Sequence, residues 1–312
     1  MKLSAHTGFR IYKGEMPSST WKRVLLEQLN LLYVISESLI DNPDYATHEI
    51  RKTTKRIRAI YRLYLSVLGE EAYIRGKELF SSLSNLLAGQ RISAVHLEML
   101  HEIAGDVKNP VDDKLMNHII SKQQQGHQKI TKQLNHDGRI VLQIKQTITN
   151  EIERLDREQV LSCSYPDIIE GLKGTYSSGK KSLDLLTRHP VTENFHNLRK
   201  KVKLVWNQLI LLRPVWPAMI TPLIRQMDLL AEKLGTDHDL AELERLLLSG
   251  KKTHYPVASA QKLSAYIAFR RESCQKAIIN SAFKLYTEKP AAFAGKMATY
   301  CRLYYEPGAV SC

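Results

Sequence analysis

Two segments of the chain place a histidine ahead of closely spaced cations. They are His48-Glu-Ile-Arg51-Lys52-Thr-Thr-Lys55-Arg56-Ile-Arg58 and His196-Asn-Leu-Arg199-Lys200-Lys201-Val-Lys203. In both, cations follow the histidine at plus three, plus four and plus seven, and these positions share one face of an α-helix. Arginine and lysine side chains gathered on one face attract phosphate and other anions. These two basic stripes therefore indicate binding of a polyanion.

A run of charges on a helix is commonly just a solvated face, so a single stripe would carry little weight. Residues 48–62 contain six Lys and Arg but a single acid, Glu49, so ion pairs within the helix cannot account for the cations. The same spacing returns 148 positions later, at His196. Two stripes that face each other repel, which costs stability unless a polyanion lies between them. The repeat therefore favours binding over a solvated surface.

The two histidines begin the stripes, and their role depends on what stands beside them. A general acid or base needs a partner, but no carboxylate recurs at a fixed offset from both His48 and His196. A histidine near an anion tends to gain a proton and can then donate two hydrogen bonds. We therefore expect both to face phosphate, with an ordinary polar histidine at a helix start as the alternative.

Further cations and one hydroxyl extend the expected surface. Arg62 follows the first stripe by one helical turn, and the helices preceding the stripes carry Arg23, Lys173 and Lys180. Tyr176 can donate its hydroxyl to phosphate, whereas Tyr61 falls on an apolar face and is expected in the core. The predicted anion-binding residues are Arg23, His48, Arg51, Lys52, Lys55, Arg58, Arg62, Lys173, Tyr176, Lys180, His196, Arg199, Lys200 and Lys203.

Two other motifs suggest chemistry that their surroundings do not support. Gly174–Lys180 meets the Gly-x-x-x-x-Gly-Lys spacing of a P-loop, but Lys181 stands where Ser or Thr would bind magnesium, and no strand precedes it. Thr236–Asp239 contains a histidine and two aspartates, but its first and last residues also fit a capping box that opens a helix. We favour the capping box. No catalytic residue, cofactor or metal site is predicted.

Composition bounds the class of protein and its location. The 312 residues are 43% hydrophobic, and the net charge of +13 indicates attraction to nucleic acid, an anionic membrane or polyphosphate. The four cysteines are scattered, and the first ten residues lack the apolar run of a secretory signal. Prolines and an arginine interrupt the most apolar stretch, 205–224. We therefore expect no membrane span and a cytoplasmic location, which includes association with polyphosphate granules.

Helical periodicity runs along nearly the whole chain, and no segment alternates as a strand would. Predicted helices cover about 18–40, 44–68, 73–88, 92–103, 113–135 and 139–160, then about 167–188, 192–212, 217–234, 237–248, 258–287 and 291–304. The second series repeats the plan of the first, which predicts an internal duplication with halves 1–162 and 163–312. Short connections between long amphipathic helices favour an all-α fold of two antiparallel helical bundles.

The chain closely resembles the CHAD domain, the conserved histidine α-helical domain. The resemblance rests on the two histidine phrases, on Gly171-Leu-Lys-Gly-Thr-Tyr176-Ser-Ser-Gly179-Lys180 and on Leu234-Gly235-Thr-Asp-His238-Asp239-Leu240. It covers nearly all of residues 1–312 as a single domain. It implies two helical bundles about a pseudo-two-fold axis, with a basic central pore whose Arg and Lys bind inorganic polyphosphate. Ile92 is the counterpart of Asp239, and Trp206 that of Arg58, so the two walls of such a pore are expected to differ.

We therefore predict a protein that binds inorganic polyphosphate or another polyanion without catalysis. Nucleic-acid binding is the first alternative, but it calls for aromatic or amide side chains among the cations, and the stripe faces carry almost none. An enzyme or accessory subunit that processes polyphosphate or a triphosphate is the second. It requires paired acids to hold magnesium, or a nucleophile beside a base. Acids are scarce on the stripes, which places this alternative lower.

Overall fold

The computed structural model describes residues 8–106, 109, 111–136, 138–159, 161–248 and 257–306. Within these ranges the regular structure is entirely helical, which confirms the predicted all-α fold. The elements are α1 (Pro17–Glu37), α2 (Pro43–Leu63), α3 (Leu65–Leu86), α4 (Ala88–Ala104), α5 (Asp113–His136), α6 (Arg139–Arg157), α7 (Tyr165–Arg188), α8 (Thr192–Leu212), the 3-10 helix η1 (Arg213–Val215), α9 (Pro217–Leu248), α10 (Val257–Leu285) and α11 (Pro290–Tyr305). The internal duplication and the halves 1–162 and 163–312 stay predictions.

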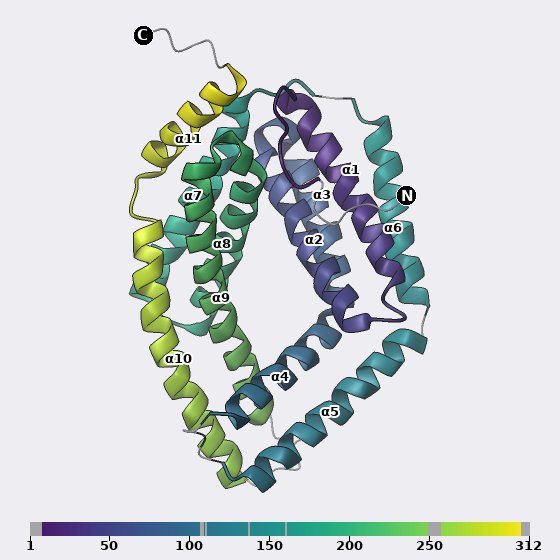
Figure 1. The fold of residues 1–312 in the computed structure, drawn as a ribbon, viewed down its shortest axis with the longest axis vertical. Helices are drawn as coiled ribbons and strands as arrows, with labels where there is room; N and C mark the ends of the chain where they lie inside the picture. Colours follow the sequence, from purple (N-terminus) through teal and green to yellow (C-terminus); the bar gives the residue numbers. More distant parts are fainter. Residues whose placement is uncertain are drawn as a thin grey trace.

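Four helices form a closed ring of contacts in the middle of the molecule. Helix α2 packs against α8 and α4, and α9 packs against the same two helices. In Figure 1, α2 and α4 face α8 and α9, with α1 and α6 beyond α2 and with α10 and α11 beyond α8. Gln208 of α8 donates from Nε2 to the Ala59 carbonyl oxygen of α2 at 3.3 Å and ties the two helices together. The ring therefore unites the helices that carry the two basic stripes.

The apolar faces of α2 and α8 are buried, as their sequence pattern predicts. Ile50 and Ile57 of α2 and Leu198 and Val202 of α8 belong to one large core and have no exposed surface. A second, smaller core joins α4, α5, α9 and α10 through residues such as Leu243. Because burial of these faces fixes the rotation of each helix, the basic stripes must leave the core on the opposite side.

Glycine lets α7 pass close to α2. A Cβ added at Gly171 would lie 1.8 Å from the Leu63 carbonyl oxygen, so any other residue would displace the backbone. A second glycine explains a wrong boundary. The predicted helix 44–68 ends early, at Leu63, and α3 begins at Leu65 and continues through a kink at Gly69, whose φ of 81° favours glycine.

Helix α9 is continuous where the sequence predicts two helices. It runs from Pro217 to Leu248, so the predicted break between 234 and 237 is wrong. The predicted capping box fails with it, because a capping box needs the free N–H groups of a helix start. Thr236 instead donates its hydroxyl to the Glu232 carbonyl oxygen at 3.3 Å, in mid-helix.

The most apolar stretch of the chain lies inside the bundle and is divided among three elements. Residues 205–224 run through the end of α8, the 3-10 helix Arg213–Val215 and the start of α9. In the described part of the chain, no helix combines the length and the apolar character that crossing a bilayer requires.

Candidate anion-binding site

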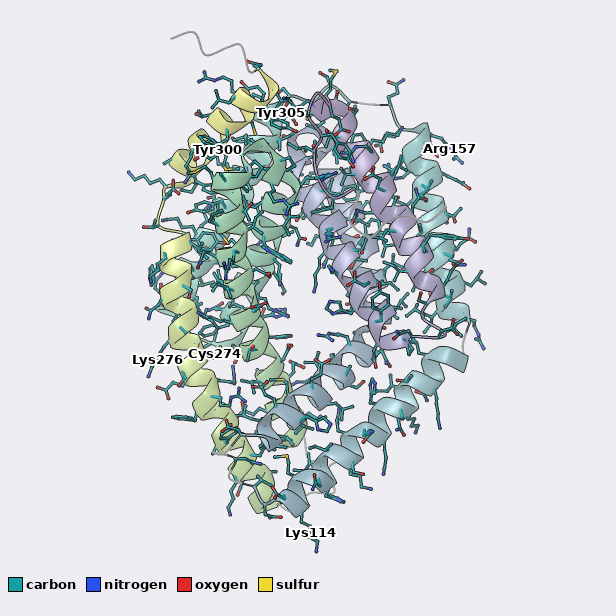
Figure 2. All side chains as sticks on the ribbon, in the orientation of Figure 1. Lys114, Arg157, Cys274, Lys276, Tyr300 and Tyr305 are labelled. Atoms are coloured by element: carbon teal, nitrogen blue, oxygen red, sulfur yellow. The ribbon has the colours of Figure 1, made fainter. Side chains whose placement is uncertain are left out.

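Six cations from three helices of the ring lie close enough to act on one another, and we call them the cationic cluster. They are Arg51, Lys55 and Arg58 of α2, Arg91 of α4, and Arg199 and Lys203 of α8. The charges of Arg199, Arg51, Lys203 and Arg58 all act on Lys55. Those of Arg58, Arg91 and Arg199 act on Arg51. The two stripes therefore converge inside the ring, and Figure 2 shows side chains of α2, α8 and α9 extending toward its middle.

Lys55 occupies the centre of the cluster. It is half-buried, and within the described ranges no hydrogen bond or ion pair engages its ammonium group. Burial and the charges of the neighbouring arginines and Lys203 lower the pKa of Lys55 to about 7. A much larger fraction of this amine is therefore neutral at pH 7 than in a solvated lysine. An anion placed beside it would restore the charge.

The two arginines of α2 are fixed to α3 by hydrogen bonds. Arg51 donates from Nη1 to the Ser84 carbonyl oxygen at 2.5 Å, and Arg58 donates from Nη1 to Ser81 Oγ at 3.1 Å. Burial lowers the pKa of both guanidinium groups. The remaining N–H groups of each fork stay available to an anion, because one guanidinium has five donors.

Arg199 has a buried Nε without a hydrogen-bond partner among the described residues. Burial lowers its pKa, and Asp239 of α9 opposes this effect. Burial in turn raises the pKa of Asp239, against the lowering effect of Arg199, Arg91 and Lys55. Asp239 is thus a carboxylate beside the cluster, although the sequence pattern predicts a helix cap at this position. Its place in the Leu-Gly…His-Asp segment is the signal that could have located it.

Ion pairs with the cluster are long. Within the described residues, the carboxylates nearest to its cations are Asp228 Oδ1, 3.9 Å from Lys203 Nζ, and Glu98 Oε1, 4.0 Å from Arg91 Nη1. Lys203 also lies over the ring of Trp206, with Nζ 4.3 Å from its centroid. The cluster therefore keeps most of its positive charge without a close counter-ion.

The histidines and outer lysines lie at the edges of the cluster. The His48 side chain is about half exposed; its partial burial and then Arg91 lower its pKa, and burial and then Lys200 lower that of His196. The ring centroids of His196 and of His238 on α9 lie 4.5 Å apart, with the ring planes tilted by 33°. Burial and then Arg199 lower the pKa of His238 to about 4. Exposed Lys200 donates to Asn197 Oδ1 at 3.4 Å, and Lys52 donates to Glu49 Oε1 at 3.0 Å.

Two of the predicted anion-binding residues lie on helices outside the ring and pair with carboxylates there. Arg23 on α1 donates from Nε to Glu15 Oε1 at 2.5 Å and from Nη1 to Glu27 Oε2 at 3.0 Å. Lys173 on α7 pairs with Glu170 at 2.9 Å. Their positive charges are already compensated, so the structure does not bring them into the site. Local acids that the spacing of the cations does not reveal account for the difference.

Lys180 and Tyr176 of α7 form hydrogen bonds with the C-terminal end of α10. The ammonium group of Lys180 donates to the carbonyl oxygen of Tyr286 at 2.6 Å, and the Tyr176 hydroxyl donates to that of Leu285 at 2.9 Å. Both atoms satisfy carbonyl groups that a helix end leaves free. Tyr176 is fully buried, so it does not face an anion.

Arg62 diverges from the rest of its stripe. Its guanidinium lies over the Tyr73 ring of α3 at 5.5 Å, and its charge acts on Lys201 rather than on the cluster. Tyr61 is buried as predicted, and its hydroxyl donates to Glu151 Oε1 at 2.5 Å.

The aspartates and histidine of 236–239 do not form a metal site. Asp237 is buried and accepts from Arg271 Nε at 3.1 Å and from Gln275 Nε2 at 2.8 Å, so it joins α9 to α10. Within the described residues, no group of three or more His, Cys, Asp and Glu side chains is arranged to hold a metal ion.

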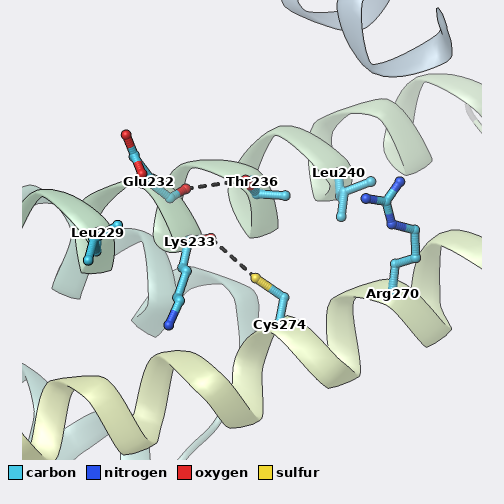
Figure 3. Close-up of a pocket in the computed structure, with 7 residues that line it drawn as sticks. All are labelled: Leu229, Glu232, Lys233, Thr236, Leu240, Arg270 and Cys274. Carbon is cyan, nitrogen blue, oxygen red and sulfur yellow. Dashed lines mark hydrogen bonds between the residues drawn. The ribbon is translucent and has the colours of Figure 1, made fainter. Parts of the chain in front are cut away.

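A separate pocket of about 390 Å³ lies between α9 and α10 (Figure 3). Its lining includes Lys233, Arg270 and Cys274, and the Cys274 thiol donates to the Lys233 carbonyl oxygen at 3.4 Å. No member of the cationic cluster lines this pocket, so it is not part of the candidate site.

A family model and two solved structures match this chain. The family model of the CHAD domain matches residues 23–248, which include all four helices of the ring. The structure is similar to PptA from Streptomyces chartreusis, with a TM-score of 0.61 and 16% identity over 88% of this chain and 100% of that chain. It is also similar to the CHAD domain from the plant Ricinus communis, with a TM-score of 0.65 and 16% identity over 89% of this chain and 97% of that chain. No curated protein matches by sequence.

Proposed function

Because the chain belongs to the CHAD domain family, we propose that it binds inorganic polyphosphate in the cationic cluster and does so without catalysis. The observation that supports this most strongly is the convergence of six cations whose ion pairs with described carboxylates are no shorter than 3.9 Å. Such an arrangement opposes folding unless an anion compensates it.

The cluster suits a flexible chain of phosphates. Polyphosphate carries about one negative charge per phosphate, so several cations on two facing helices can bind successive groups. The Lys55 ammonium has no hydrogen-bond partner among the described residues and only part of its side chain is buried, so it can contact a phosphate oxygen, whereas Arg199 Nε has no partner but is buried. If all six cations bind, the slope of log affinity against log salt would be about −4, by analogy with ~0.7 per contact for single-stranded nucleic acid.

The test is the double variant Arg199→Gln with Lys203→Gln. Removing two charge-assisted contacts should weaken polyphosphate binding roughly 100-fold at low salt and reduce the salt slope to about −3. A matched control, Arg157→Gln with Lys276→Gln, removes the same charge from exposed ion pairs on α6 and α10, labelled in Figure 2. Calorimetry measures the polyphosphate affinity of the double variant and of its control, and circular dichroism measures their helicity. An equal loss of affinity in both double variants would show that polyphosphate binds through the overall positive charge and not at the cationic cluster.

Two further assays address the alternatives. Competition between long polyphosphate and single-stranded RNA, at matched charge and salt, should favour polyphosphate; preference for RNA would indicate a nucleic-acid-binding protein. Incubation with polyphosphate and magnesium should release no phosphate, whereas release would show an enzyme. A cytoplasmic location is part of the proposal, supported by the free thiols of Cys163, Cys274 and Cys301.

A further inference from the structure

Lys55 combines features that make a lysine chemically reactive. Its amine has no partner within the described ranges, and it is half-buried among guanidinium groups. A lysine amine becomes a nucleophile when desolvation or neighbouring cations keep it neutral. A solvated lysine, with a pKa of ~10.4, is neutral in about one molecule in 2,500 at pH 7. The pKa of about 7 at Lys55 gives a far larger neutral fraction.

The charged groups around Lys55 come from four elements. Arg51 and Arg58 stand on its own helix, and Arg199 and Lys203 stand on α8. Asp239 of α9 and Arg91 of α4 complete the surroundings, since Asp239 acts on Lys55, Arg91 and Arg199 alike. Cations outnumber carboxylates among these groups. A small molecule that carries a phosphate would therefore be drawn to this amine in preference to an uncharged reagent of equal reactivity.

We propose that Lys55 is a site of covalent acylation by small acyl phosphates, whose phosphate the surrounding guanidinium groups recruit. The inference rests on the anion affinity proposed above for the cationic cluster. The Lys55 Nζ lone pair attacks the carbonyl carbon and forms an N–C bond. The C–O bond to phosphate breaks, the phosphate leaves with that electron pair, and it takes up the proton lost by the amine. The products are an amide and inorganic phosphate, with no change of oxidation state.

Acylation would regulate the cluster, because it removes the charge at its centre. The amide cannot form an ionic contact with phosphate, so the modified protein should bind polyphosphate about tenfold more weakly, in line with the loss of one charge-assisted contact. Lys55→Arg keeps the charge but not the reactive amine. Acetyl phosphate should therefore weaken polyphosphate binding by the unsubstituted protein and leave binding by Lys55→Arg unchanged.

The test treats the full chain with acetyl phosphate at pH 7 and follows acetylation of each lysine by mass spectrometry. Lys55 should react at least about tenfold faster than Lys114, an exposed lysine of α5 labelled in Figure 2. Acetic anhydride, which has no phosphate, should show a smaller preference. A Lys55 rate no greater than that of Lys114 would overturn the proposal, and so would an equal preference for both reagents.

Polyphosphate added before the reagent separates this inference from the proposed function. Protection of Lys55 supports both. Fast acetylation that polyphosphate does not slow supports reactive Lys55 and counts against the polyphosphate site. Tight polyphosphate binding without preferential acetylation supports the polyphosphate site and counts against a reactive Lys55.

Discussion

Replacing Lys55 by methionine should stabilise the protein and weaken its binding. Methionine has a similar unbranched length and no charge, so it keeps the packing while removing the cation at the centre of the cluster. The difference between an ordinary lysine pKa of ~10.4 and about 7 corresponds to ~5 kcal/mol. Lys55 retains contact with water, which screens its charge, so we expect ~2 kcal/mol, or ~4 °C in Tm.

The pH dependence gives this prediction its sign. Below pH 7, Lys55 is protonated in both the folded and the unfolded chain, so the folded protein bears the full repulsion. Between pH 7 and ~10.4 the unfolded chain binds the extra proton, so the stability of the unsubstituted protein rises with pH. The advantage of Lys55→Met should therefore be largest at pH 6 and fall as pH approaches 10. The affinity of the unsubstituted protein for polyphosphate should decline above pH 7, whereas its stability rises.

Urea unfolding of both proteins at pH 6, 8 and 10 measures the difference, with polyphosphate titrations at the same pH values. Lys114→Met is the matched control, because it removes one exposed lysine from α5 and should change neither quantity by much. A destabilised Lys55→Met, or a gain that does not depend on pH, would refute the account of a desolvated lysine among like charges.

Two other substitutions have expected outcomes. Asp239→Asn removes the carboxylate that acts on Arg199, Arg91 and Lys55. Polyphosphate should therefore bind about five- to tenfold more tightly, and the free energy of unfolding should fall by ~1 kcal/mol. Weaker binding in calorimetry would contradict this prediction. Gly171→Ala places a Cβ against the Leu63 carbonyl oxygen and should cost ~2 kcal/mol or more in urea unfolding, and an unchanged midpoint would show that α7 can move.

Local periodicity was sufficient to predict most of the helices. Helix α8 begins at Thr192 and ends at Leu212 as predicted, because buried apolar residues recur at helical spacing along it. Boundaries failed where a glycine permitted two outcomes. The sequence predicts a break between 234 and 237, but Gly235 lies within α9, which packs against α8 and α10. The sequence predicts a helix over 44–68, but α2 ends at Leu63 and Gly69 lies within a kink of α3.

The chemistry of the two stripes followed from residue type, but the membership of the site did not. Lys180 and Arg23 match the pattern of the cluster cations in the sequence, yet Lys180 binds carbonyl oxygens of the α10 end and Arg23 binds Glu15 and Glu27. The contact of Lys180 depends on a segment distant along the chain, and that of Arg23 with Glu15 depends on the path of the segment before α1.

By itself the sequence determined that the protein is helical, that two of its helices carry one basic face each, and that cations outnumber acids on those faces. These properties are local, since helical spacing decides which residues share a face. Only the tertiary structure decided that α2 and α8 turn these faces toward each other, that Arg91 and Asp239 join them, and that Lys55 lies at the centre. Electrostatic interactions depend on distance in space and on burial, and packing of the whole chain sets both.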